Sequence, residues 1–238
     1  MSARGIFVTG TDTGVGKTLI ACALVRALRQ AGRRVGVMKP VASGSFHTAK
    51  GLRNEDALAL MEAAGLSEST PYGEVNPYCF ELPISPHIAA KATNIEVDID
   101  LIRRKFEVLA GRADWMVVEG AGGWLAPLNG RETMADLARG LSLPALIVVG
   151  LKLGCLNHAQ LTQRAVRAHG VPLAGWVASA IGPQMSHLEA NLESLERLLA
   201  EPPLAVVPHL SDAGSRLELA SLASVLASLG DKLMKRLE

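Results

Sequence analysis

The sequence predicts an α/β fold of the doubly wound type, with a mostly parallel sheet and helices on both faces. Short apolar runs alternate along the chain with longer segments whose apolar residues have helical spacing. Hydrophobic residues make up 49% of the chain and charged residues 20%, a balance that lets a large core form. A length of 238 residues suits one such unit better than two small ones, so we expect a single domain over residues 1–238.

The elements of the first half can be placed in order. A strand is expected at residues 5–9, followed by a glycine-rich loop and a helix at 17–30 that Gly32 closes. A second strand is expected at 35–38. The region 41–86 is rich in Gly, Ser, Pro and Asn apart from a helix at 55–64, and we expect it to cover the ligand site at the carboxyl ends of the strands.

The second half continues the alternation. A helix at 98–111 leads to a buried strand at 115–118, which runs into the glycine-rich segment 119–123. Strands at 144–149 and 173–178 flank a helix at 157–169, and a last strand at 204–207 precedes an amphipathic tail at 217–237. In such open α/β sheets, ligands bind outside the carboxyl ends of the strands.

Charge and cysteine content argue against several classes of protein. The formal net charge is +1 and the longest basic run is 103–105, so no nucleic-acid partner is expected. Cys22, Cys79 and Cys155 lie far apart without CxxC spacing, which favours a reducing, cytoplasmic compartment over disulfides or zinc. No apolar run approaches about 18 residues and a strand begins near the N-terminus, so neither a membrane partner nor a signal peptide is expected.

The strongest functional signal is the loop from Gly10 to Thr18 (GTDTGVGKT), which follows a strand and opens a helix. Glycines let backbone N–H groups turn toward phosphate oxygens, and the helix N-terminus adds its positive end. Lys17 is expected at the terminal phosphates and Thr18 on Mg²⁺, so the motif predicts a P-loop NTPase-like site. The strict spacing puts glycine at position 11, where this chain has Thr11; the loop is a variant.

Three further segments lie at or just after strand ends, at 39–44 (KPVASG), 54–56 (NED) and 119–123 (EGAGG), and we expect them to frame one crevice. The oxygens of Thr18, Asp56 and Glu119 suit Mg²⁺. Taken alone, Asp56 also reads as a first-turn helix carboxylate and Ser43 as a turn residue. In combination they predict a nucleotide site whose residues are Gly14, Val15, Gly16, Lys17, Thr18, Leu19, Asp56, Glu119, Gly120, Ala121 and Gly122.

Together with the loop, these segments resemble dethiobiotin synthetases, as do 75–78 (VNPY), 85–87 (SPH) and 149–155 (VGLKLGC). The resemblance extends from the N-terminus to about Trp176 and fades beyond it. It implies an ATP- and Mg²⁺-dependent ligase that inserts CO₂ between the amines of 7,8-diaminononanoate and closes the ring of dethiobiotin, the penultimate step of biotin biosynthesis. The implied course runs through a carbamate and a carbamoyl-phosphate mixed anhydride and releases ADP and phosphate.

The resemblance also implies roles for individual residues. Lys39 and Lys17 are the expected catalytic residues, because negative charge gathers at the phosphates and the carbamate. In the resembled family, the segment that begins at Lys152 helps to hold the substrate carboxylate across the interface of a homodimer. A solvated loop is the alternative for this segment. The expected substrate-binding residues are Thr13, Ser43, Lys152, Leu153 and Asn157.

One part of the chain departs from the family. After the strand at 173–178, family members commonly place an Asn-Asp pair that reads adenine, whereas this chain has Ser179 and Ala180. Without a side-chain amide, base selectivity weakens, so CTP or GTP is expected to substitute for ATP. Pro208, His209 and Leu210 occupy a second base-proximal position, where backbone groups are available.

Two other interpretations compete with the synthetase. A regulatory or partitioning ATPase would carry an extra lysine at position 12, where this chain has Asp12. The other interpretation is a non-catalytic nucleotide-binding module or an amidotransferase-like ligase that acts on a larger acid. Against it, Lys39 and Ser43 favour chemistry on a small substrate. The guanine-reading Asn-Lys-x-Asp pattern of GTPases is absent.

Overall fold

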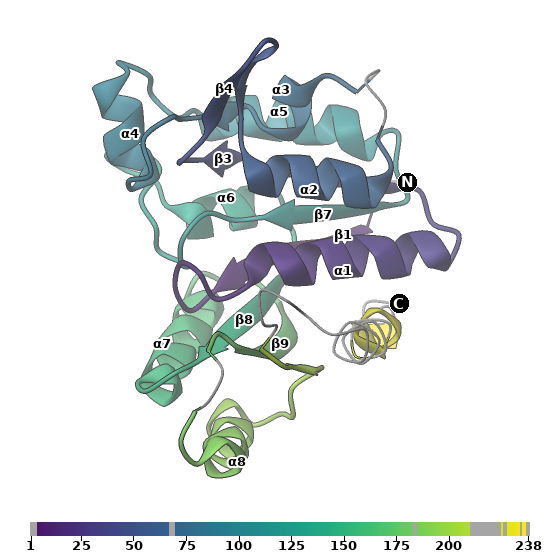
Figure 1. Ribbon diagram of the computed structural model, residues 1–238, viewed down its shortest axis with the longest axis vertical. Helices are drawn as coiled ribbons and strands as arrows, with labels where there is room; N and C mark the ends of the chain where they lie inside the picture. The colour runs from purple at the N-terminus through teal and green to yellow at the C-terminus, as the bar shows by residue number, and fades with distance from the viewer. Residues whose placement is uncertain are drawn as a thin grey trace.

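The computed structural model describes residues 4–66, 70–182, 185–209, 225, 228–233 and 235–236. Its elements alternate between strands and helices along most of the chain (Figure 1). The strands are β1 (Arg4–Gly10), β2 (Val35–Met38), β3 (Val41–Ala42), β4 (Phe46–Thr48), β5 (Gly51–Arg53), β6 (Tyr78–Cys79), β7 (Trp115–Glu119), β8 (Ala145–Leu151), β9 (Leu173–Ala180) and β10 (Val206–Val207). The helices are α1 (Lys17–Gln30), α2 (Glu55–Ala64), α3 (Tyr72–Val75), α4 (Pro86–Ala92), α5 (Ile99–Ala110), α6 (Met134–Gly140), α7 (Cys155–Ala168) and α8 (Leu188–Leu199).

The main sheet has six strands in the order β10-β9-β8-β1-β7-β2, and every pairing in it is parallel. The chain forms β1 first and then β2 at the edge, and β7 later fills the gap between them. Strand β8 pairs with β1 on its other side. The carboxyl ends of β1, β2 and β7 therefore meet at one end of the sheet, which is where ligands bind in this architecture.

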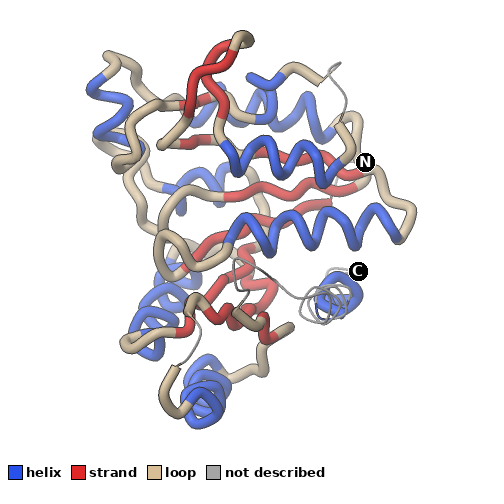
Figure 2. The backbone as a smooth tube through the Cα atoms, in the orientation of Figure 1, coloured by secondary structure: helices blue, strands red, loops and turns tan. Residues whose placement is uncertain are grey.

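Helices cover both faces of the sheet (Figure 2), so β7 and β8 are buried at every position and β1 at every position after Arg4, and apolar residues follow one another along these strands. Ile6 and Val8 of β1 pack with α1 and α2 on one face, while Phe7 packs with α5 and α6 on the other. Figure 1 shows α1 and α2 in front of the sheet and α5 behind it. The predicted doubly wound fold is confirmed.

Smaller elements cover the carboxyl end of the sheet near β2. Strand β3 pairs with β6, and β4 and β5 form an antiparallel hairpin that leads directly into α2. This is the region 41–86 that we expected to lie over the site. Helix α2 begins after Asn54, whose side chain accepts hydrogen bonds from the backbone N–H groups of Asp56 and Ala57.

The predicted elements lie within two residues of the observed ones, and α1, β2 and α2 match theirs at both ends. Helices α3, α4, α6 and α8 were not predicted. Of the predicted tail at 217–237, residues 217–224, 226–227, 234 and 237 lie outside the described residues, whereas 228–233 are helical and bury Leu229 and Leu233. Among the residues that the structure describes, no helix combines the length and the apolar character needed to cross a membrane.

Candidate functional site

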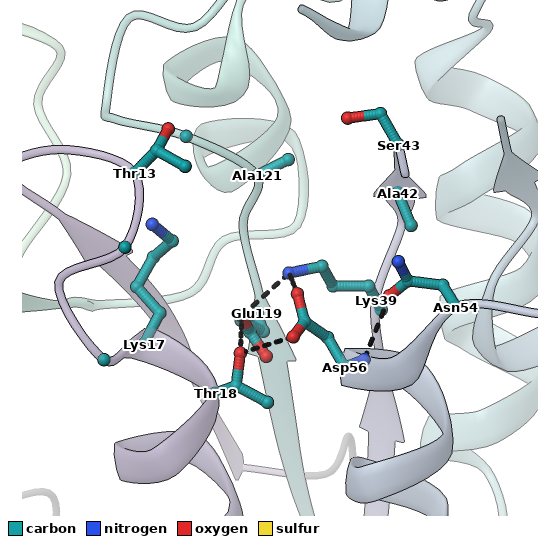
Figure 3. Close-up of a pocket in the computed structure, with 13 residues that line it drawn as sticks. Thr13, Lys17, Thr18, Lys39, Ala42, Ser43, Asn54, Asp56, Glu119 and Ala121 are labelled. Atoms are coloured by element: carbon teal, nitrogen blue, oxygen red, sulfur yellow. Dashed lines mark hydrogen bonds and ion pairs between the residues drawn. The ribbon is translucent and has the colours of Figure 1, made fainter. Parts of the chain in front are cut away.

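A cavity of about 360 Å³ opens at the carboxyl ends of β1, β2 and β7 (Figure 3). The phosphate loop and the start of α1 form one wall, the segment after β2 and the start of α2 form the opposite wall, and the end of β7 lies between them. The three segments expected to frame one crevice therefore do so. The lining residues are Thr13, Gly14, Gly16, Lys17, Thr18, Lys39, Ala42, Ser43, Asn54, Asp56, Glu119, Ala121 and Gly122.

The phosphate loop has the backbone shape that its glycines allow. Gly14 and Gly16 have φ values of 73° and 91°, in the left-handed region that side chains disfavour. A Cβ at Gly16 would also lie 2.9 Å from Ser179 Oγ. Between these glycines, Val15 is fully buried and anchors the loop in the core, while α1 begins at Lys17. The free N–H groups at this helix start lie where phosphate oxygens would bind.

Lys17 lies inside this loop and is largely buried. Its Nζ donates a hydrogen bond to the backbone carbonyl of Asp12 at 2.9 Å, which holds the side chain across the loop. Burial, together with the nearby Lys39 ammonium, lowers the pKa of Lys17 to about 8. An anion in the loop would reverse this effect, because it favours the charged form of the lysine.

A compact cluster of charged and hydroxyl groups lies beside the loop (Figure 3). The Lys39 ammonium donates to Asp56 Oδ2 at 2.8 Å and to Glu119 Oε1 at 2.7 Å. The Thr18 hydroxyl lies 2.9 Å from Asp56 Oδ1 and 2.8 Å from Glu119 Oε1. The side chains of Lys39 and Glu119 are 4% and 1% exposed, while that of Asp56 is 40% exposed and faces the cavity. Residues from α1, α2 and β7 and the residue directly after β2 thus form one hydrogen-bonded cluster.

The charges in this cluster stabilise one another. Burial alone would lower the pKa of Lys39, but the carboxylates of Glu119 and Asp56 outweigh it and raise the pKa above its usual value. Burial would likewise raise the pKa of Asp56, but Lys39 and the Thr18 hydroxyl hold it below its usual value. Lys39 therefore stays protonated and Asp56 ionised at neutral pH.

The cluster also fits a divalent cation. Glu119 Oε2 is buried and has no hydrogen-bond partner among the described residues, which leaves one carboxylate oxygen available for a further ligand. Together with Asp56 and the Thr18 hydroxyl it supplies the few hard oxygen ligands that Mg²⁺ uses alongside phosphate and water. Within the described part of the chain, no group of three or more His, Cys, Asp or Glu side chains is arranged to hold a metal ion. A cation at this site would therefore depend on phosphate and water for its remaining ligands.

The expected substrate-binding residues fall into two places. Thr13 and Ser43 lie on opposite walls of the cavity (Figure 3). Lys152 is outside the lining but is joined to the loop, since its Nζ donates to Asp12 Oδ2 at 2.6 Å. This hydrogen bond lowers the pKa of Asp12. Two exposed residues follow, Leu153, which is 98% exposed, and Asn157 in the first turn of α7.

The expected base-proximal residues lie together beside the loop rather than within the lining. Ser179 is buried next to Gly16, and Ala180 ends β9. Val207 of β10 pairs with Ser179, which brings the next residues, Pro208 and His209, to the same strand ends. Leu210 lies outside the described residues. Leu19 is in the first turn of α1, and the backbone carbonyl of Gly120 accepts from Lys39 at 3.4 Å.

Two residues of the lining, Ala42 and Asn54, were not among the predicted site residues. Ala42 has no chemical signal, because it contributes backbone and a methyl group. Asn54 has one: an asparagine directly before Glu55 and Asp56 is typical of a helix N-cap, and the capped turn carries Asp56 into the site.

Comparisons with known proteins identify relatives of this chain. A family model described as "AAA domain" matches residues 4–216. The chain is 51% identical over 212 residues to a protein of Pseudomonas paraeruginosa named ATP-dependent dethiobiotin synthetase BioD, covering 87% of this chain and 91% of that one. It is 46% identical over 219 residues to a protein of the same name from Aromatoleum aromaticum, covering 92% and 96%.

Solved structures with low sequence identity share the fold. The chain superposes on the MinC:MinD cell division protein complex of Aquifex aeolicus with a TM-score of 0.62 at 17% identity, covering 98% of this chain and 96% of that one. It superposes on a ParA family ATPase of Chlorobium tepidum with a TM-score of 0.57 at 17% identity, covering 98% of each. At such identities the likeness speaks for architecture alone.

Proposed function

The chain belongs to the ATP-dependent dethiobiotin synthetase family and is therefore a ligase, and on that premise we propose that it makes dethiobiotin from 7,8-diaminononanoate, CO₂ and ATP. The observation that carries the proposal is the buried Lys39 ammonium, held at 2.7 and 2.8 Å by two carboxylates beside a phosphate loop. A loop that only held a nucleotide would have no use for a second buried cation facing the same cavity. A reaction that gathers negative charge next to the terminal phosphate has such a use.

The proposed reaction has three steps. One substrate amine takes up CO₂ as a carbamate and releases a proton. A carbamate oxygen then attacks the γ-phosphorus of ATP, which forms a carbamoyl-phosphate mixed anhydride and releases ADP. The second amine attacks the carbonyl carbon, loses a proton and expels phosphate, and this closes the cyclic urea.

Lys17 and Lys39 are the proposed catalytic residues, and their positions support separate tasks. Lys17 spans the loop, where its charge would offset that of the terminal phosphates. Lys39 lies across the cavity, between Asp56 and Glu119 and close to where a carbamate would face the γ-phosphate. Both act by position and fixed charge, which phosphoryl transfer mainly requires.

We propose that Thr18, Asp56 and Glu119 hold Mg²⁺, directly or through water, when nucleotide is bound. These three residues would hold the ion beside the phosphates, and its charge would offset theirs. The unpartnered Glu119 Oε2 and the cavity-facing Asp56 support this assignment. The hydroxyl of Thr18 lies between the two carboxylates, and a cation would replace these hydrogen bonds as the partner of its oxygen.

We place the substrate between the two walls of the cavity and propose that the enzyme is a homodimer. Thr13 and Ser43 face the cavity from either side and would bind the diamine end. Lys152, Leu153 and Asn157 would hold the carboxylate end together with a second subunit. Leu153 is almost fully exposed and is therefore accessible to a second copy of the chain. The three cysteines, free in the structure, are consistent with the proposed cytoplasmic location.

Nucleotide selectivity is the part of the proposal that departs from the family. Ser179 offers one hydroxyl and Ala180 offers none, so the backbone at 208–209 would supply the remaining polar contacts to the base. We therefore propose that the phosphates contribute most of the nucleotide affinity and that CTP and GTP support turnover alongside ATP.

The test measures phosphate release from ATP, CTP and GTP with Mg²⁺, bicarbonate and 7,8-diaminononanoate, each omitted in turn, while mass spectrometry follows dethiobiotin. We expect product that depends on every component, with only modest differences among the nucleotides. Hydrolysis that needs neither diamine nor bicarbonate and yields no dethiobiotin would refute the proposal and favour a regulatory ATPase.

A further inference from the structure

Two sequence motifs near the site have no task in the proposed reaction. They are VNPY at 75–78 and the asparagine of NED at 54–56. Both contribute buried polar side chains, since Asn76 is 2% exposed and Asn54 6% exposed. Burying an amide is unfavourable unless its hydrogen bonds are made inside the protein, so the partners of these side chains indicate what they do.

Asn76 holds the backbone on which Lys39 is mounted. Its Nδ2 donates to the carbonyl oxygen of Lys39 at 2.6 Å and to that of Tyr78 at 3.1 Å. The backbone N–H of Lys39 donates in turn to the carbonyl of Val75 at 2.9 Å. Both backbone groups of Lys39 are therefore fixed by the segment 75–76, at the point where β2 has ended.

Tyr72 connects Asn76 to the start of α2. Its hydroxyl donates to Asn76 Oδ1 at 2.8 Å and accepts from the backbone N–H of Asn54 at 2.8 Å. Burial raises the pKa of this phenol, so it keeps the proton that it donates. The guanidinium of Arg53 lies over the ring at 4.2 Å and holds the ring in place.

Asn54 completes the connection to Asp56. Its Oδ1 accepts from the N–H of Asp56 at 3.1 Å and caps α2. Asp56 Oδ2 then accepts from Lys39 Nζ at 2.8 Å. The hydrogen bonds form a closed ring that leaves Lys39 through its backbone carbonyl, passes through Asn76, Tyr72, Asn54 and Asp56, and returns to its ammonium.

We propose that this closed set of hydrogen bonds, which we call the Lys39 ring, fixes the positions of the Lys39 ammonium and the Asp56 carboxylate. Tyr72 and Asn76 are then positioning residues for the reaction. The inference rests on the proposed function of Lys39. Neither Tyr72 nor Asn76 lines the cavity, so both act through the groups that they hold. Displacements of about 1 Å at a reacting centre can lower rates about 100-fold, so a loosened ring lowers turnover without removing any group that binds nucleotide.

A matched pair of variants tests this. In Tyr72→Phe the Lys39 ring loses the hydroxyl that joins Asn76 to Asn54. In Tyr78→Phe the lost hydroxyl also accepts from the N–H of a helix N-cap residue, Asp98, at 2.9 Å, but it has no contact with the Lys39 ring through that group. The two changes remove the same atom from the same residue type beside the same kind of cap.

We expect Tyr72→Phe to lower kcat for dethiobiotin formation roughly 10- to 100-fold with nucleotide affinity changed less than about threefold, while Tyr78→Phe keeps kcat within about twofold. In a Lys39→Ala background, Tyr72→Phe should lower the residual rate much less than it does in the wild type, because only the Asp56 carboxylate is then left to position. Amide exchange should quicken at the first turn of α2 in Tyr72→Phe and at that of α5 in Tyr78→Phe.

Equal kcat values for the two variants, or a full additional loss in the Lys39→Ala background, would overturn the proposal. Unchanged exchange in α2 would do the same. A wild-type chain that makes no dethiobiotin would instead show that the proposed function is wrong, and the exchange data would still report on the hydrogen-bonded ring.

Discussion

Replacing Lys39 with alanine is the sharpest test of the site, because the structure predicts separate effects on turnover and on stability. Removal of one preorganised charge-stabilising donor typically costs about 100- to 1,000-fold in kcat, which corresponds to about 3–4 kcal/mol. We expect a loss of that size in Lys39→Ala. Nucleotide affinity should change little, since Lys17 and the loop backbone are left intact.

The stability effect follows from what Lys39 leaves behind. Its ammonium holds the carboxylates of Asp56 and Glu119, and the Glu119 side chain is almost completely buried. Removing one partner of a buried ion pair costs about 3–5 kcal/mol, because the remaining charge has no compensation. Mg²⁺ should restore part of this stability by binding between the same two carboxylates.

The pH range of this effect follows from the pKa directions. The raised pKa of Lys39 makes its contribution present below about pH 10.4 and lost above the folded-state pKa. The lowered pKa of Asp56 makes its contribution present above about pH 3.9 and lost below its folded-state pKa. The loss in Lys39→Ala should therefore be largest from about pH 5 to 9.

Three measurements decide the matter: phosphate release under saturating substrates, calorimetric nucleotide binding, and urea unfolding with and without Mg²⁺. Lys91→Ala, which removes an exposed lysine of α4, serves as the control and should match the wild type. Normal turnover in Lys39→Ala would refute the catalytic role. Unchanged stability would refute the electrostatic reasoning, whatever the turnover.

Three more predictions concern the phosphate loop. The pKa of Lys17 is about 8, and bound phosphate favours its charged form. Nucleotide affinity should therefore be full below pH 8 and fall about tenfold per pH unit above it. Calorimetry that shows no proton uptake on nucleotide binding near pH 8 would contradict this. Gly14→Ala should cost about 1–2 kcal/mol in urea unfolding because of its left-handed backbone, and Gly16→Ala should cost more because its Cβ also meets Ser179 Oγ at 2.9 Å; equal losses would show that this contact relaxes freely. Ser179→Asn should raise kcat/KM for ATP relative to CTP and GTP by providing an amide, and an unchanged ranking would show that this residue does not face the base.

The sequence predicted the sheet, the loop and the crevice because each rests on a local signal. Apolar runs mark β1, β2 and β7, and glycine spacing marks the loop. Parallel strands then bring their carboxyl ends together, so Lys39 and Glu119 could be assigned to one place although 80 residues separate them. These predictions needed no knowledge of side-chain orientation.

The remaining features depend on orientation or on partners distant in sequence. No local pattern shows that the Asn76 amide faces the carbonyl of Lys39, since those residues are 37 positions apart. Helices α4 and α6 have seven residues each, which is too short for a clear helical period. The position of Ser179 beside Gly16 likewise emerges only when β9 is placed in the sheet.

The insertion of β7 between β1 and β2 has a consequence for how the protein acquires its site during folding. Strands β1 and β2 are made first but are not neighbours in the sheet, because β7, which pairs with both, comes 77 residues after the end of β2. Until β7 docks, Glu119 cannot reach Lys39, and the cavity lacks its floor. Nucleotide can therefore stabilise only chains in which this long-range pairing has been completed, so we expect added ligand to slow unfolding without speeding the early steps of folding.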